Sequence, residues 1–466
     1  MADFFKKNYE VLILTMVFAF VVVFSLNNLA TKPSIWPDEA FNIEAAQNFS
    51  LFGKLDIQTA PGIFSNASYT LVTSNYPAMV PLAGFFSIFG FGWDQARIFM
   101  ILWLLAALAT IYFVTRSFFG KPAAIYALLL CVTFASFFGI GRPVTGEVPG
   151  FVFLLLGLYY LIKRENYWLV GLFFGLALAA KPSIYHALPL VFLIYVLFFR
   201  KDIIFKIVKF AAGGFLPVLL YFIFIIPDFF SVGGWINIYK LYQNPFIDSP
   251  SLTTNFLNNV SGFFSQTTLI YFSLLIFAAV FAFVRHRKAI PEIWQKSFLF
   301  FCIYGALVII YFLRSPGWFR YLFALELLTL ILIYPSFLLI FKKWQALVFC
   351  GILISVQVVQ LFFFSDIAYS TRPQEVSSFV NSRSAQSVGI INLSQVAAFI
   401  PPEKKYHVIS DVRQIGENPL SFSDDKLPEL IVLWKGDEYA VQYQDVLDKK
   451  YALLKEFGVY KVYQRI

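Results

Sequence analysis

Long apolar runs decide what this chain can fold into. Near-continuous apolar stretches recur along it. The length of each is close to the ~20 residues that a helix needs to cross a bilayer. They are residues 11–30, 98–115, 123–140, 203–226, 268–284, 297–313, 321–341 and 345–364. Only 14% of the 466 residues are charged, whereas soluble proteins have about 25%. The runs exclude a soluble globular fold and predict an integral membrane protein built from transmembrane helices.

Further segments add crossings. Residues 148–162 predict another span, and residues 168–199 are long enough for two short helices that meet at Lys181 and Pro182. With about 15 residues each, these two helices are short for hydrocarbon, so we expect a thinned or protein-lined cavity beside them. Residues 77–90 are too short to span and are expected to lie in the membrane interface. The total is a polytopic α-helical membrane protein with about eleven transmembrane helices.

The positions of the basic residues set the orientation. The net charge of +9 could indicate nucleic-acid binding, but Lys and Arg cluster in alternate short loops, such as Lys6 with Lys7 and Lys342 with Lys343. Cytoplasmic loops carry such an excess of positive residues. The pattern predicts a protein of the plasma (inner) membrane with a cytoplasmic N-terminus, whose partner is the lipid bilayer and not nucleic acid.

The composition changes abruptly after Phe364. Residues 365–466 hold 12 Lys/Arg and 13 Asp/Glu, and short β-like runs alternate there with helix-like ones. The β-like runs are residues 388–392, 406–410, 430–434 and 458–463. We therefore expect a transmembrane domain over residues 1–364 and a small extracytoplasmic α/β domain over residues 365–466.

Asp38 and Glu39 are the first candidates for chemistry, because charged groups at the edge of a membrane are costly and are functional hypotheses by default. They follow Pro37, a residue typical of a helix start, and acids in a first turn face the positive end of the helix dipole. They could simply be acidic residues that stabilise the first turn of a helix and have no catalytic role. The alternative is a carboxylate that acts as general base on an acceptor hydroxyl, since the dipole keeps it ionised.

Basic residues dominate the second group of candidates. Arg142 and Glu147 lie in a tight loop between two spans, where they form either a structural pair or part of a site. Lys181 could snorkel to the interface or contribute to the same site. Arg314 and Arg320 flank a Pro-Gly turn and could bind a phosphate, because the planar guanidinium binds phosphate oxygens bidentately.

Two other polar features do not indicate a catalytic or metal site. Glu326 lies deeper in its span and is expected to be a buried protonated carboxyl or part of an internal ion pair. The three His residues are scattered and offer no metal-ligand spacing. We therefore expect no metal and no cofactor, with a divalent metal as the open alternative.

Several segments of the chain occur in an order typical of one family. They are Pro37-Asp38-Glu39, Tyr76-Pro77-x-x-x-Pro81, Phe89-Gly90, Arg97, the run from Gly171 to Pro182, and Arg320-Tyr321. This arrangement over about residues 10–335 resembles the membrane glycosyltransferases of the GT-C superfamily. The likeness is greatest to protein O-mannosyltransferases and to the aminoarabinose transferases of lipid A.

The resemblance implies a polyprenyl-phosphate sugar donor and an acceptor hydroxyl of a protein, lipid or glycan on the extracytoplasmic face. It makes Asp38 the catalytic acid/base residue, with Glu39 beside it and Glu147 as the second acidic residue. The residues expected to bind the lipid phosphate are Arg142, Lys181, Arg314, Arg320 and Tyr321. The aminoarabinose transferases carry a Lys in the first-loop segment where this chain has Asn75, so the acceptor stays open.

The predicted reaction is a single displacement that inverts the anomeric carbon. Asp38 is the base, and Arg320, Lys181 and Arg142 hold the leaving phosphate. One alternative is a transporter or flippase of lipid-linked sugars, which would also place cations near a phosphate, and another is a non-catalytic sensor or scaffold. The long acidic first loop, the external domain and the absence of an internal repeat favour the enzyme, because many secondary transporters are built from repeated halves.

Overall fold

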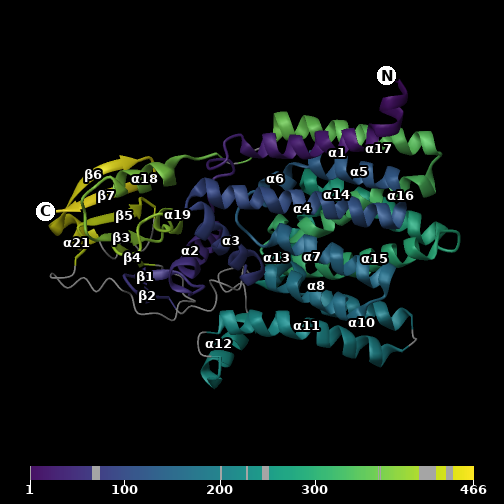
Figure 1. The fold of residues 1–466 in the computed structure, drawn as a ribbon. Helices are drawn as coiled ribbons and strands as arrows, with labels where there is room; N and C mark the ends of the chain where they lie inside the picture. Colours follow the sequence, from purple (N-terminus) through teal and green to yellow (C-terminus); the bar gives the residue numbers. More distant parts are fainter. Residues whose placement is uncertain are drawn as a thin grey trace.

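A bundle of helices and a sheet domain at one end of the bundle make up the fold (Figure 1). The computed structural model describes residues 2–65, 74–199, 202–226, 229–243, 251–365, 367, 369–408, 427–436 and 444–466. The C-terminus lies in the sheet domain, and the N-terminus lies at the opposite end of the bundle. We call the end of the bundle that carries the sheet domain the domain end.

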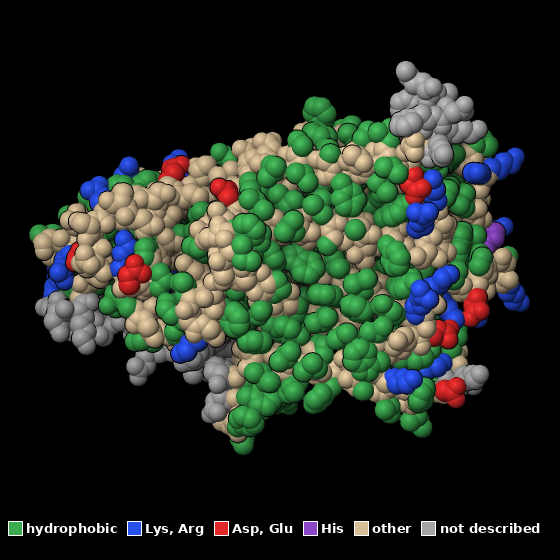
Figure 2. Space-filling model, in the orientation of Figure 1, with side chains coloured by type: hydrophobic (Ala, Val, Ile, Leu, Met, Phe, Trp, Pro, Cys, Tyr) green, Lys and Arg blue, Asp and Glu red, His purple; other side chains and the backbone are tan. Residues whose placement is uncertain are grey.

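On the face that Figure 2 shows, apolar side chains cover the middle of the bundle. Figure 2 shows that, on one face, charged side chains gather at the end with the N-terminus and over the sheet domain. Seven helices of the described residues are long and apolar enough to cross a membrane. They are α1 (Ala2–Leu26), α4 (Trp93–Phe119), α11 (Ile203–Ile225), α14 (Thr267–His286), α15 (Glu292–Arg314), α16 (Phe323–Ile340) and α17 (Lys343–Val359). The predicted polytopic helical membrane protein is confirmed.

The other predicted crossings are helical but short or broken. α5 (Lys121–Thr133) and α6 (Ala135–Gly141) form a pair bent by 65°, which would be an eighth crossing. The remaining elements are α7 (Glu147–Tyr159), its π-helical continuation η2 (Tyr160–Arg164), α8 (Tyr167–Ala180), α9 (Pro182–Tyr185) and α10 (Leu188–Phe198). Lys181 lies at the break between α8 and α9, where the sequence predicts that two short helices meet.

Glycines bring α8 and α11 into close contact. A Cβ on Gly171 would lie 1.9 Å from the carbonyl oxygen of Phe210, and one on Gly213 would lie 1.9 Å from that of Trp168. Small residues permit this approach of two backbones, and the resulting packing holds helices together in lipid. The contact fixes α8, and with it the position of Lys181 after its last turn.

The sheet domain follows η4 (Gln360–Phe364), the π-helical end of α17. Its elements are α18 (Arg372–Asn381), β3 (Val388–Ile391), α19 (Ser394–Ala397), β4 (Lys405–Val408), β5 (Leu430–Trp434), α21 (Gln444–Lys450), β6 (Tyr451–Phe457) and β7 (Tyr460–Arg465). The five described strands run in the order β4-β3-β5-β7-β6. β3 is parallel to β4 and β5, whereas β7 is antiparallel to β5 and β6. The expected small sheet domain is confirmed.

Four of these strands coincide with predicted β-like runs. They are β3, β4, β5 and β7; residues 409 and 410 of the second run lie outside the described part of the chain. β6 was not predicted. It is an edge strand in which only Tyr451 and Phe457 are buried, so its sequence lacks the alternation that identifies a half-buried strand.

The segment between α1 and α4 folds at the domain end. α2 (Pro37–Phe52) begins at the predicted proline and is followed by Gly53, which adopts a left-handed φ of +67°. α3 (Tyr76–Phe89) covers the predicted short apolar segment. The hairpin β1 (Gln58–Ala60) and β2 (Ile63–Phe64) was not predicted, because strands of three and two residues carry no periodic signal.

The sheet domain docks on α2. Lys405 of β4 pairs with Glu44 of α2 at 2.6 Å between Nζ and Oε1, and both side chains are fully buried. Phe399 stacks on Trp93 at the start of α4, and Ala398 packs against Ala40. An ion pair and an apolar contact together join the domain to the membrane part.

His407 makes the stability of this docked domain depend on pH. The imidazole is fully buried beside Phe41, and neither ring nitrogen has a hydrogen-bond partner. Burial, with Lys405 nearby, lowers the pKa of His407 from 6.5 to about 3. The unfolded chain therefore binds a proton near pH 6.5 that the folded domain does not, so stability is present above that pH and falls below it.

We expect the unfolding temperature to decrease more steeply from pH 7 to pH 5 in the wild type than in His407→Phe. The Phe side chain has a similar volume and no titrating group. Below pH 6.5 the free energy of unfolding of the wild type should fall, relative to that of the variant, by up to about 1.4 kcal/mol for each pH unit. Thermal unfolding of both proteins over this range measures it. Equal slopes would show that His407 is not the responsible group.

Candidate active site

An ion pair between the first loop and α16 marks the site. Asp38 lies in the first turn of α2, and Arg320 lies in the short helix η3 (Phe319–Leu322) that leads into α16. The Arg320 Nη1 donates to Asp38 Oδ2 at 2.8 Å. The two side chains keep 14% (Arg320) and 29% (Asp38) of their surface exposed. This pair is therefore open to a ligand.

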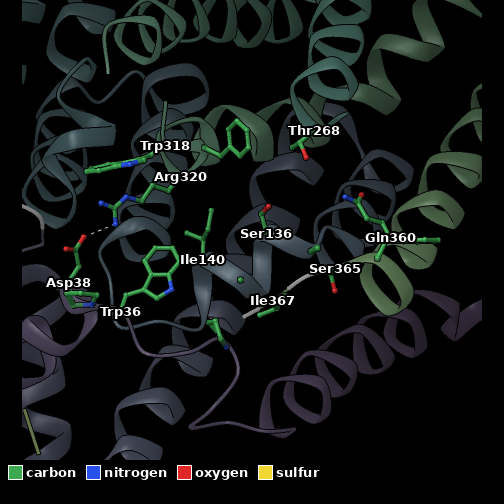
Figure 3. A pocket seen from close by; sticks show the side chains of 16 residues that line it. Trp36, Asp38, Ser136, Ile140, Thr268, Trp318, Arg320, Gln360, Ser365 and Ile367 are labelled. Atoms are coloured by element: carbon green, nitrogen blue, oxygen red, sulfur yellow. Dashed lines mark hydrogen bonds and ion pairs between the residues drawn. The ribbon is translucent and has the colours of Figure 1, made fainter. Parts of the chain in front are cut away.

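The pair lies in the wall of a cavity of about 770 Å³ (Figure 3). The other lining residues are Pro33, Trp36, Pro37, Ala135, Ser136, Gly139, Ile140, Thr268, Trp318, Phe319, Gln360, Phe364, Ser365 and Ile367. Figure 3 shows Asp38 and Arg320 on one side and Gln360 and Ser365 on the opposite side. Among the described residues of this wall, Asp38 and Arg320 are the ones with ionisable side chains, and we call the side on which they lie the charged end of the cavity.

A second cavity of about 550 Å³ extends the first between α14 and α17. The two share Thr268, Gln360 and Phe364 as lining residues. Beyond them the wall is formed mainly by apolar and aromatic side chains, with Thr267, Tyr271 and Ser355 as polar members. Together the cavities suit a long ligand with a charged head and an apolar body.

A second ion pair, between Glu147 and Lys181, lies close to the first. Glu147 begins α7, and its Oε1 is 3.4 Å from the Lys181 Nζ, with both side chains almost completely buried. Gly146 permits this approach, because a Cβ there would lie 1.8 Å from the carbonyl oxygen of Ala180. Lys181 also interacts electrostatically with Arg320 and Asp38. The structure thus brings four of the predicted site residues together.

Glu39 points into a different cluster. Its two carboxylate oxygens accept hydrogen bonds from Arg97, at 2.5 Å from Nε and 2.7 Å from Nη2. The amide of Val144 also donates to Glu39, and Arg97 donates to the carbonyl oxygens of Leu29 and Pro33. With both oxygens occupied and the side chain fully buried, Glu39 holds α2 against α4 and does not face the cavity.

The remaining predicted phosphate ligands do not line the cavity. Arg142 is buried and donates from Nη2 to the carbonyl oxygens of Asn27 and Asn28. Arg314 is exposed at the end of α15. Tyr321 is buried between aromatic rings. Of the five predicted phosphate ligands, Arg320 alone contributes to the wall, and Lys181 lies close behind it.

Two tryptophans complete the charged end of the cavity. The Arg320 guanidinium is 4.7 Å from the ring centre of Trp318 and 5.8 Å from that of Trp36. Such cation–π contacts hold the guanidinium in place without neutralising its charge. Trp36 stands next to the first-loop motif, but the sequence assigns neither tryptophan a role.

Asn259 is a further residue that the sequence did not single out. It lies in α13 (Leu252–Ser265), and its Nδ2 donates to the carbonyl oxygens of Phe312 at 3.0 Å and Ser315 at 2.8 Å. These carbonyls belong to the end of α15, where helical amide donors run out; the Phe312 carbonyl also accepts from the amide and the hydroxyl of Ser315. Gly317, with a φ of +81°, completes the turn toward Arg320 against the Asn259 side chain. A single Asn in an amphipathic helix gives no signal of such a contact.

No metal site is evident among the described residues, which contain no group of three or more His, Cys, Asp or Glu side chains that could bind an ion. Glu326 is buried in α16, as expected, and does not line the cavity.

Comparison with known proteins agrees with this architecture. Residues 77–227 match the dolichyl-phosphate-mannose-protein mannosyltransferase family. The structure is similar to ArnT from Cupriavidus metallidurans bound to undecaprenyl phosphate, with a TM-score of 0.62, 13% identity, and coverage of 97% of this chain and 98% of that one. The chain has a GT-C glycosyltransferase fold. The predicted resemblance is thereby confirmed.

A second structure extends the comparison within the GT-C fold. The oligosaccharyltransferase of Archaeoglobus fulgidus, solved with a tethered acceptor peptide, has a TM-score of 0.59 and 12% identity. The alignment covers 97% of this chain and 73% of the archaeal one. No curated protein matches the chain by sequence. The GT-C likeness therefore rests on fold and on one matched segment.

The Asn259 contact allows a test of how this site is held. Asn259→Ala should lower the free energy of unfolding by about 1–3 kcal/mol, because the buried carbonyl oxygen of Ser315 loses the hydrogen bond from Asn259. Asn258→Ala is the matched control, since Asn258 is exposed on the same helix. Thermal unfolding of the detergent-solubilised variants measures the difference. If the two variants unfold at the same temperature, the contact contributes nothing.

Proposed function

We propose that the chain is a membrane glycosyltransferase that moves a sugar from a polyprenyl-phosphate donor to an acceptor hydroxyl. The observation that carries this proposal is the accessible Asp38–Arg320 pair at the charged end of an elongated apolar cavity. We assign the domain end to the extracytoplasmic face and the N-terminus to the cytoplasm. The undecaprenyl phosphate bound to ArnT and the acceptor peptide of the archaeal oligosaccharyltransferase support a lipid-linked donor and a separate acceptor.

Donor binding would also activate the base. Arg320 pairs with Asp38, and Lys181 pairs with Glu147. A phosphate that enters the cavity competes with Asp38 for the guanidinium, whose planar fork suits phosphate oxygens. The ion pair between Asp38 and Arg320 is then broken, and the Asp38 carboxylate can accept a proton from the acceptor. Donor binding thus couples the grip on the phosphate to the activity of the base.

The reaction would be a single displacement. Asp38 takes the proton of the acceptor hydroxyl, and the hydroxyl oxygen attacks the anomeric carbon. The bond between that carbon and the phosphate oxygen breaks, and polyprenyl phosphate leaves with the electron pair. Arg320 and Lys181 stabilise the charge that develops on it, an effect worth about 3–4 kcal/mol for one well-placed donor. A single displacement inverts the sugar configuration.

Asp38→Asn should reduce turnover by about 100-fold or more, because the amide cannot act as general base. The assay supplies polyprenyl-phosphate sugars and mixed protein, lipid and glycan acceptors to the purified protein in lipid nanodiscs and measures released polyprenyl phosphate. Asp94→Asn is the matched control, since Asp94 is an exposed acid in the first turn of α4. Wild-type turnover in Asp38→Asn would remove Asp38 from the mechanism.

The same assay separates the enzyme from a flippase. A wild-type protein that moves the lipid-linked sugar across a proteoliposome membrane but releases no polyprenyl phosphate would be a transporter, and the proposed function would be wrong.

We further propose that the reaction needs no divalent metal, because a donor phosphodiester carries one negative charge and two cations are available to it. Turnover should be unchanged after treatment with EDTA. A loss of turnover that Mg²⁺ or Mn²⁺ restores would contradict this part of the proposal.

A further inference from the structure

Helix α2 is held at two places by buried ion pairs. Near its start, Glu39 pairs with Arg97 of α4, which ties α2 to the membrane bundle. About 7.5 Å further along the helix axis, at 1.5 Å per residue, Glu44 pairs with Lys405 of the sheet domain. Asp38 lies directly beside the first of these contacts. The direction in which α2 presents Asp38 therefore depends on the bundle and on the sheet domain together.

The Glu44 contact is a junction of three elements. The Oε1 of Glu44 accepts hydrogen bonds from the Lys405 Nζ at 2.6 Å and from the backbone amide of Gln58 at 2.8 Å. The Gln58 side chain in turn donates to the carbonyl oxygen of Pro402 at 3.0 Å. α2, the β1 hairpin and the chain entering β4 are thus joined around one carboxylate.

Loss of either partner in this junction would strongly destabilise the contact between α2 and the sheet domain. Glu44 and Lys405 are both fully buried, and removing one partner of a buried ion pair leaves an uncompensated charge away from water. α2 therefore cannot separate from the sheet domain without exposing Glu44 or leaving it unpaired. Removing one partner of this pair should therefore weaken the hold of the domain on the helix more than the loss of one apolar contact would.

We propose that the sheet domain is a positioning part of the active site, and that Lys405 and Glu44 hold α2 so that Asp38 keeps its place opposite Arg320. Lys405 acts through α2 and touches no reacting atom. This assigns the C-terminal domain a role in catalysis beyond covering the cavity. The kinetic part of the inference rests on the proposed function, whereas the structural part does not.

Hydrogen exchange of the full-length protein in nanodiscs tests the structural part. Lys405→Met should increase amide exchange across residues 37–52 about tenfold and leave α4 unchanged. Lys405→Arg should keep wild-type exchange, because it preserves the charge. Lys449→Met is the matched control, since Lys449 forms an exposed ion pair in the same domain. Wild-type exchange of α2 in Lys405→Met would overturn the proposal.

A second variant covers the case in which Lys405→Met does not fold. Glu44→Gln/Lys405→Met removes both charges, so no unpaired charge stays buried. It should fold and still show faster exchange of α2 than the wild type. Wild-type exchange and wild-type turnover in this double variant would also overturn the proposal.

Steady-state kinetics test the positioning role. Lys405→Met should lower kcat about tenfold or more and change the KM for the lipid donor by less than about twofold, whereas Arg320→Ala should raise that KM. A raised KM with unchanged kcat in Lys405→Met would mean that the domain acts on donor binding, and the proposal would be wrong. If no donor is turned over even by the wild type, the proposed function fails, and the exchange experiment alone decides the positioning role.

Discussion

A charge that leaves water must have a partner, and this constraint organises the domain end of the molecule. Glu39, Glu44 and Glu147 each keep at most 2% of their side-chain surface exposed, and each is paired with a cation that is equally buried. Breaking such a pair leaves an unpaired buried charge, which costs about 3–5 kcal/mol. Asp38 and Arg320 differ, because both are partly exposed at a cavity. The buried pairs fix the backbone, and the accessible pair is free to exchange partners with a ligand.

The same constraint explains why the membrane helices are broken where they are. Backbone groups outside regular helices are tolerated at membrane depth only where protein or a water-filled cavity surrounds them. The break at Lys181 and the short helix at Arg320 each carry a member of one of the two ion pairs, and the bend between α5 and α6 comes directly before residues of the cavity wall. Residues of α6 and the Arg320 helix form part of the cavity wall. Interrupted spans thus place polar groups where a continuous helix would offer only apolar side chains.

The sequence predicts features that depend on local pattern and misses those that depend on tertiary pairing. Apolar length identified the spans, Pro37 identified the start of α2, and alternating loop charges suggested that Asp38, Glu147, Lys181 and Arg320 share one end. The partner of Glu39 is 58 residues away and that of Glu44 is 361 residues away. No spacing rule connects such positions, so the sequence could not show that the Glu39 oxygens are occupied by Arg97. Arg142, predicted as a phosphate ligand, likewise binds backbone carbonyls that no side-chain pattern reveals, and it does not line the cavity.

The order of these elements along the chain adds a consequence for how the site is assembled. Asp38 belongs to the second helix, Arg320 lies 282 residues later, and Lys405 follows in the sheet domain. Until the sheet domain has docked, Glu44 lacks Lys405 as its partner, and α2 is held to the membrane part by contacts such as those of Glu39 with Arg97 and of Asn42 with the Val144 carbonyl. The bundle can therefore reach its membrane topology before Asp38 is fixed opposite Arg320. In this architecture the hydrophobic effect places the helices, and the ion pair between Glu44 and Lys405 adds the last contact that links α2, and with it Asp38, to the sheet domain.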